Sequence, residues 1–219
     1  MTIKYLGHAT FLITTGTGLR IVMDPYEPGA FGAALNYGPI RDAADVLTIS
    51  HEHADHNFVT GVPGSPIALR GPKSLAGAEI EVVDAFHDVN GGKERGEIRL
   101  FKITADGVSL AHMGDLGHVL TAEQVAALGK VDVLCIPVGG TFTVDAATAW
   151  QNVDLVKPKV VIPMHFKTAR TSLPLAPVEK FADGAGDTPV EWVAGSCVEV
   201  TAEMLAEGAR RVIVLEPAN

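Results

Sequence analysis

The sequence predicts an α/β (α+β) fold with helices on the outside and sheet on the inside. The first half reads as short apolar β-segments joined by turns, and the second half alternates helix with strand. No Pro/Ser-rich linker, charge run or low-complexity tract divides the 219 residues, of which 47% are apolar. That content is ample for one large core, so we expect residues 1–219 to form a single domain.

The first half predicts a series of short strands. Three precede residue 25, namely IKYLGH, TFLITT and LRIVMD, with a turn at residues 16–18. Residues 27–39, EPGAFGAALNYGP, are rich in Gly and small residues and predict a loop, which we expect to be a mobile flap beside a site. Further strands are predicted at DVLTIS, PIALR, AEIEVVDAFH, EIRLFKITA and GVSLAHM, the last two joined by a hairpin turn at residues 105–107.

The second half predicts two clear helices. Thr121 is typical of an N-cap with Gln124 three residues on, and Gly129 can close the helix EQVAAL. The second helix, DAATAWQNVDLV, must stop before Pro158. Strands are predicted on either side of it, at VDVLCIPVGG and KVVIPMHF, and a weaker helix at 177–182 precedes short strands near the C-terminus.

Composition narrows the function classes. A formal charge of -9 and a pI near 5.3 argue against nucleic-acid binding. No apolar run reaches the ~18 residues needed to span a bilayer, and the N-terminus reads as strand rather than as a signal peptide. Cys135 and Cys197 lie in apolar contexts, so we expect two buried thiols and a cytoplasmic protein.

The stretch HEHADH at residues 51–56 directly follows an apolar run. It is either a histidine-rich polar loop or half of a metal site. His51 and His53 are two residues apart, so their side chains can converge on one ion, while Asp55 and His56 can point at a second ion. Imidazole nitrogen and carboxylate oxygen suit zinc, and also iron, manganese or nickel.

The missing ligands of such a site are sought at later strand ends. His87 follows one apolar run, His112 and Asp115 follow another, and His165 ends a third. The ends of strands are where folds of this class collect their active-site groups. Each histidine alone could be a structural residue, but together with HEHADH the pattern favours ligation.

This ordered series resembles the motifs of the metallo-β-lactamase fold superfamily. The segments LGHATFLI, MDPY and IPVGGTFTVDAA extend the resemblance over nearly the whole chain, and are similar to the branch that includes ascorbate-6-phosphate lactonase and many metal-dependent hydrolases. That branch also resembles, more distantly, the phospholipase D that acts on N-acyl phosphatidylethanolamine. The resemblance implies a four-layer αββα sandwich.

The resemblance also implies a ligand set. One ion would be held by His51, His53 and His87, and a second by Asp55, His56 and His165, with Asp115 bridging both. His112 competes with His87 for the first ion. We prefer His87, which leaves His112 to orient Asp115 or a ligand.

Other residues have two readings each. His8 either orients a metal ligand, contacts the substrate or has a purely structural role. His118 either faces the cleft of the metal site or points away from it. Asp24 is expected to support a ligating histidine rather than to ligate, and Asp145 is either a helix N-cap or a buried support. A last group forms either an anion pocket or a solvated face: Lys73, Lys167 and Arg170.

The implied function is hydrolysis of a small-molecule ester, lactone, amide or phosphodiester by a hydroxide shared between two divalent ions, zinc first and Mn, Fe or Ni as alternatives. Asp55 would double as proton acceptor, and His8 and His112 would assist. A non-catalytic metal-binding or sensing protein is the main alternative. A redox di-metal protein is less favoured, because such proteins resemble HxExDH with Glu at the position of His53. The sequence is compatible with a homo-oligomer.

Overall fold

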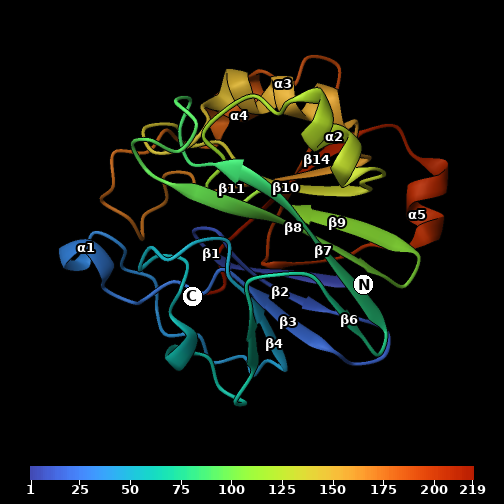
Figure 1. Ribbon diagram of the computed structural model, residues 1–219. Coiled ribbons are helices and arrows are strands. Elements are labelled where there is room, and N and C mark those ends of the chain that lie inside the picture. Colours follow the sequence, from blue (N-terminus) through green and yellow to red (C-terminus); the bar gives the residue numbers. More distant parts are fainter.

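Two β-sheets face each other in the computed structural model, which describes residues 1–219 apart from the side chain of Glu207 (Figure 1). The six-stranded sheet has the order β13 (Cys197–Glu199), β1 (Thr2–Gly7), β2 (Thr10–Thr14), β3 (Arg20–Met23), β4 (Val46–Thr48), β5 (Ile67–Leu69). The eight-stranded sheet has the order β12 (Val190–Val193), β14 (Arg211–Leu215), β11 (Val160–Met164), β10 (Val133–Pro137), β9 (Val108–His112), β8 (Glu97–Ala105), β7 (Ala78–Phe86), β6 (Lys73–Leu75).

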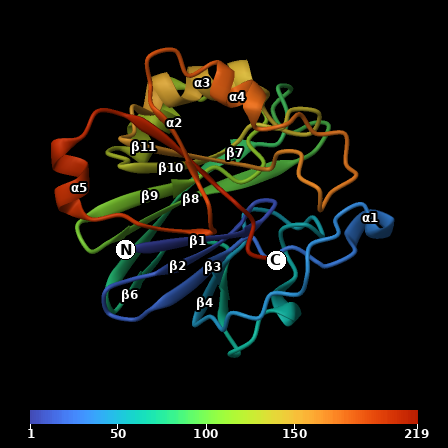
Figure 2. The same ribbon diagram turned by 180° about the vertical axis from the view of Figure 1, so that it is seen from behind.

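The helices lie mainly outside the eight-stranded sheet. Figures 1 and 2 show α2 (Ala122–Leu128), α3 (Ala146–Val156) and α4 (Glu179–Asp183) on its outer side. Thr121 and Gln124 cap α2 reciprocally, as predicted. Asp145 accepts a hydrogen bond of 2.8 Å from the Thr148 amide, so it takes the N-cap role of its two expected roles. The remaining short helices are α1 (Ala30–Ala33), α5 (Ala202–Glu207) and the 3₁₀ turn η1 (Val59–Gly61).

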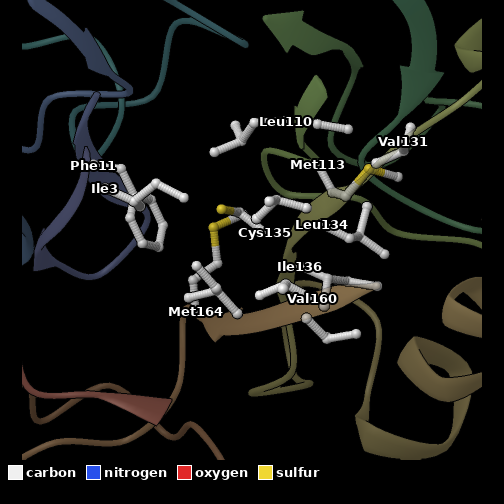
Figure 3. Close-up of a cluster of buried hydrophobic side chains, with 14 of the residues drawn as sticks. Ile3, Phe11, Leu110, Met113, Val131, Leu134, Cys135, Ile136, Val160 and Met164 are labelled. Carbon is white, nitrogen blue, oxygen red and sulfur yellow. The ribbon is translucent and has the colours of Figure 1, made fainter. Parts of the chain in front are cut away.

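The main core fills the space between the two sheets. In Figure 3, Ile3 and Phe11 of the six-stranded sheet face Cys135 and Met164 of the eight-stranded sheet. All four side chains are fully buried. Burial of this apolar surface is the principal stabilising term of the fold.

A second apolar cluster covers the other face of the six-stranded sheet. There Leu12, Val22 and Leu47 pack against Tyr26 and Tyr37, which come from the connection between β3 and β4. This outer layer consists mostly of loops with α1 and η1, because residues 27–39 are too rich in Gly to sustain a long helix. The predicted mixed α/β class with two packed sheets is confirmed, and its fourth layer is mostly loop, with only the short α1 and η1.

Three details differ from the prediction. Cys135 is buried, but Cys197 is exposed because it lies on the edge strand β13, so the expectation of two buried thiols is wrong for Cys197. The short strand β6 and the short helix α5 were not predicted. Within the described residues, no helix is long and apolar enough to cross a membrane.

Strand direction determines where the side chains of interest gather. β1, β3 and β4 run the same way in one sheet, and β7, β9 and β11 run the same way in the other. Each of these strands is followed within three residues by one residue of a polar cluster between the sheets: His8, Asp24, His51, His87, Asp115 and His165.

Candidate metal centre

Sharp backbone turns aim three of these side chains into the cluster. His8, Asp24 and His165 directly follow β1, β3 and β11, with positive φ of 56°, 46° and 52°. A non-glycine residue in this region costs about 1–3 kcal/mol and persists where its surroundings fix it. The backbone of His8 is fixed because its carbonyl accepts hydrogen bonds from the His165 amide at 2.8 Å and from Tyr5 Oη at 2.9 Å.

The first group of donor atoms comes from His51, His53 and His87. The Nε2 atom of His51 lies 2.9 Å from Nδ1 of His53. One ring nitrogen from each of the three residues falls within 4.8 Å of the others, a spacing that can hold a metal ion. The structure therefore brings together the three residues expected at the first ion.

The second group comprises Asp55, His56 and His165, joined by His8. One donor atom from each of the four residues lies within 4.8 Å of the others. His8 Nε2 is 2.9 Å from Asp55 Oδ2, and the His8 ring lies over that of His165 with centroids 4.0 Å apart. All four side chains are buried.

The Asp115 carboxylate lies between the two groups. Its Oδ1 is 3.1 Å from His56 Nε2, and its Oδ2 is 3.2 Å from His87 Nε2 and 3.6 Å from His165 Nε2. Gly114 allows this placement, because its φ is +49° and an added Cβ would lie 2.9 Å from Ser50 Cβ. Both oxygens of one buried carboxylate thus face histidines of both groups.

Asp24 lies behind the two groups and sets the orientation of two histidines. Its carboxylate accepts hydrogen bonds from the Ser50 amide at 2.8 Å and from Ser50 Oγ at 2.5 Å. It also accepts one from Nδ1 of His56 at 2.8 Å, while Ser50 Oγ lies 2.8 Å from Nδ1 of His51. With their Nδ1 atoms donating, both rings turn Nε2 towards the cluster.

His112 does not join the donor groups. Its Nε2 donates to the Ala9 carbonyl at 2.7 Å, and its Nδ1 accepts from the Gly114 amide at 3.2 Å. Both ring nitrogens are therefore bonded to backbone, one in the turn that carries Asp115 and the other between β1 and β2. His118 is similar, since Nε2 accepts from the Phe86 amide and Nδ1 donates to the Val119 carbonyl.

Burial and charge keep most of the cluster in the protonation states that bind cations. Burial lowers the pKa of His51 and of His165 to about 3, so both imidazoles are neutral at pH 7. Burial raises the pKa of Asp115, but the neighbouring His165 and His56 outweigh it and hold that pKa well below 3.8. Burial lowers the pKa of His56, but Asp115 and Asp55 outweigh it and raise that pKa.

Unpaired polar atoms show that the cluster fits a metal. His56 Nε2, Asp55 Oδ1 and Asp115 Oδ1 are buried and have no hydrogen-bond partner among the described residues. Buried polar atoms are normally paired. Lone pairs of nitrogen and carboxylate oxygen that converge in this way are the donor set of zinc and related divalent ions.

A cavity of about 440 Å³ opens onto the cluster. Its lining comprises Phe31, His53, Asp55, His87, Glu94, Arg95, Asp115, Phe142, His165 and Leu173. Lys73, Lys167 and Arg170 are exposed and are not in this lining, so of their two readings the structure supports the solvated face. Lys167 Nζ instead donates to the Leu173 carbonyl at 3.0 Å, and Lys73 lies on the edge strand β6.

A family model described as the β-lactamase superfamily domain matches residues 2–165, well over half of the chain. The chain belongs to the metallo-β-lactamase superfamily. A structure from Thermotoga maritima, described as a candidate Zn-dependent hydrolase of this superfamily, is 34% identical with a TM-score of 0.78, and the match covers 98% of each chain.

Two curated relatives in this superfamily are described as metal-dependent hydrolases. The relative from Carboxydothermus hydrogenoformans is 30% identical over 77% of this chain and 85% of its own length. The relative from Thermococcus onnurineus is 32% identical over 76% of this chain and 84% of its own length. The predicted class, a metal-dependent hydrolase of the metallo-β-lactamase superfamily, is confirmed.

Arg95 and Glu94 are cavity residues that the sequence did not reveal. Both belong to the loop between β7 and β8, and neither follows a strand end as the histidines do. The Gly91-Gly92 pair in this loop is the one signal in the sequence that a tightly folded turn follows His87.

Proposed function

We propose that this metallo-β-lactamase superfamily member holds two divalent cations and hydrolyses a small-molecule ester, lactone, amide or phosphodiester. One observation carries the proposal: the buried Asp115 carboxylate presents one oxygen to His56 and the other to His87, which belong to different donor groups. A carboxylate between two such groups can bridge two ions of a dinuclear site.

The residues that would hold the ions follow from the two donor groups. His51, His53 and His87 would hold one ion, and Asp55, His56 and His165 the other, with Asp115 shared. Zinc fits this set of nitrogen and oxygen donors, and Mn, Fe or Ni are accepted by the same ligands. When bound, such ions supply Lewis acidity and lower the pKa of a water towards neutrality, so no serine or cysteine nucleophile is needed.

The protein's own groups would manage the proton and the geometry. Asp55 lines the cavity and would accept the proton of the attacking water, while the 2.9 Å contact from His8 Nε2 holds its carboxylate in place. His112 would act at a distance from the substrate, by fixing the Gly114 amide and so the position of Asp115. Phe31, Phe142 and Leu173 would exclude water from the remaining cavity wall.

The whole chain would act as one domain, because residues that hold the proposed site come from the first β-segment through to β11. A cytoplasmic location remains a prediction from the sequence.

Metal analysis coupled to turnover tests the proposal. We expect the purified protein to carry two equivalents of metal and to hydrolyse at least one member of a panel containing bis(4-nitrophenyl) phosphate, 4-nitrophenyl esters and lactones. Activity should disappear with a chelator and return with added Zn²⁺. Two equivalents of metal without any turnover would instead support the sensing alternative.

A further inference from the structure

Arg95 is the one cation in the lining of the cavity, apart from the histidines. Its guanidinium lies over the Phe142 ring, with Cζ 5.8 Å from the ring centroid, and Nη2 makes a long contact of 3.4 Å to the Thr141 carbonyl. It forms no ion pair with any carboxylate of the described residues. The Glu94 carboxylate beside it accepts instead from Asn90 Nδ2.

The loop that carries Arg95 is rigidly organised around Asp88. The buried Asp88 carboxylate accepts hydrogen bonds from four backbone amides, those of Asn90, Gly92, Glu94 and Arg95, at 2.8–3.0 Å. The loop also closes onto the metal cluster, because the His87 amide donates to the Gly96 carbonyl at 3.0 Å. The backbone of Arg95 is thus held at a fixed position relative to His87.

Another part of the cavity wall is apolar. Phe142, Leu173 and the half-exposed Phe31 form it, and Phe31 comes from α1. A ligand in this cavity would therefore meet a metal cluster at the base, an aromatic and aliphatic wall, and one guanidinium without a carboxylate partner. Guanidinium groups in such positions recognise carboxylate or phosphate oxygens through paired N–H donors.

We propose that Arg95 is a substrate-binding residue that selects an anionic substrate: an ester or lactone with an apolar body and a negatively charged group away from the bond that is hydrolysed. This inference rests on the proposed hydrolase function and names its substrate class. The charged group pairs with Arg95, the apolar body packs on Phe142 and Leu173, and the scissile bond lies over the cluster at Asp115 and His165.

Matched esters test this selection. Mono-4-nitrophenyl glutarate and 4-nitrophenyl pentanoate have acyl chains of the same length and differ in a terminal carboxylate. We expect the metal-loaded wild type to prefer the glutarate ester. Arg95→Ala should lower the ratio of the two kcat/KM values about tenfold, since a partly exposed charged hydrogen bond contributes modestly. Bound metal should stay at the wild-type level.

Lys93→Ala is the matched control, because Lys93 is exposed on the same loop and lies outside the cavity lining. It removes one positive charge without touching the ligand, so the ratio should remain that of the wild type. If the ratio of the two kcat/KM values fell equally in both variants, the preference would come from the net positive charge of the loop, and the role of Arg95 would be overturned. An unchanged ratio in Arg95→Ala would overturn it too.

A binding measurement separates this inference from the hydrolase proposal. In calorimetric titrations of the metal-loaded protein, 4-phenylbutanoate should bind about tenfold more weakly to Arg95→Ala than to the wild type, whereas uncharged 4-phenylbutanamide should bind both alike. This outcome without turnover of any ester would retain the anion site and reject the hydrolase. Equal 4-phenylbutanoate affinities, or no binding to the wild type, would reject the anion site.

Discussion

His56 Nδ1 donates a hydrogen bond of 2.8 Å to Asp24 Oδ2, and the same oxygen accepts from Ser50 Oγ, which bonds to His51. One buried carboxylate therefore orients a histidine of each donor group. Partners of this kind fix the tautomer and the ring orientation of metal-binding histidines. Asp24 thus links the two donor groups on the Nδ1 side of their rings, and Asp115 links them on the Nε2 side.

Asp24→Asn should weaken metal binding at both positions. The amide cannot accept all three hydrogen bonds that the carboxylate accepts, so both rings lose their fixed orientation, and a roughly 10- to 100-fold loss of affinity is expected. Competition with a chromophoric chelator measures it. Ser50→Ala is the matched control, because it disconnects His51 but leaves the bond to His56. Equal losses at both positions in Ser50→Ala would contradict this division.

His87→Ala should lose metal far more than His112→Ala. The Nε2 atom of His87 lies 3.2 Å from Asp115, whereas both ring nitrogens of His112 are bonded to backbone. Metal equivalents per chain after dialysis report the difference. For His112→Ala we expect destabilisation by about 1–3 kcal/mol, because the Gly114 amide and the Ala9 carbonyl lose their partner. The reverse order of metal loss would exchange the two roles.

The metal-free protein should lose stability as the pH falls from 5.5 to 4.5. Burial lowers the pKa of His51 and His165 to about 3, against 6.5 in an unfolded chain. The unfolded chain therefore binds more protons in this window, so stability present above pH 6.5 is lost as the pH falls towards 3, by about 1.4 kcal/mol per unit for each histidine. His56 adds no slope here, since its raised pKa keeps it protonated in both states.

Urea denaturation at several pH values checks this expectation. The slope of unfolding free energy against pH should fall by about 1.4 kcal/mol per unit in His165→Gln, which removes one of the two histidines with a pKa of about 3. A slope that His165→Gln leaves intact would contradict the assignment.

Asp88→Asn should loosen the loop that carries Arg95. Burial raises the Asp88 pKa, but the four amide hydrogen bonds outweigh it and lower that pKa to about 2, so the carboxylate is charged throughout the working range. Asn offers one acceptor oxygen instead of two and cannot satisfy four amides. Hydrogen exchange at the amides of residues 90–95 should accelerate, and the preference for the anionic ester should fall. Unchanged exchange would show that other contacts fix the loop.

Much of the fold and of the cluster could be predicted because both follow strand periodicity. His51, His87 and His165 each follow an apolar run, and parallel strands deliver such residues to one edge. The clustering of Asp115 with them followed from the same pattern and from the resemblance to known motifs.

The remaining features depend on tertiary contacts. The positive φ angles of His8 and Asp24 have no signature in the sequence, because the surrounding packing imposes them. The charged residues of the cavity could not be predicted for the same reason. Lys167 was a candidate because of its position in the sequence, but the loop around Asp88 places Arg95 in the cavity instead. Composition predicted that residues 27–39 form a loop. It did not predict that Tyr26 and Tyr37 cover the six-stranded sheet, because no periodic helix marks these contacts.

The metal content of Asp115→Asn, measured beside its activity, tests the central claim most directly. If this carboxylate serves both ions, the variant should retain well under two equivalents per chain, with both positions weakened, and hydrolysis of the best substrate should fall at least about a hundredfold. Two tightly held equivalents together with wild-type turnover would contradict the dinuclear site that the position of Asp115 supports.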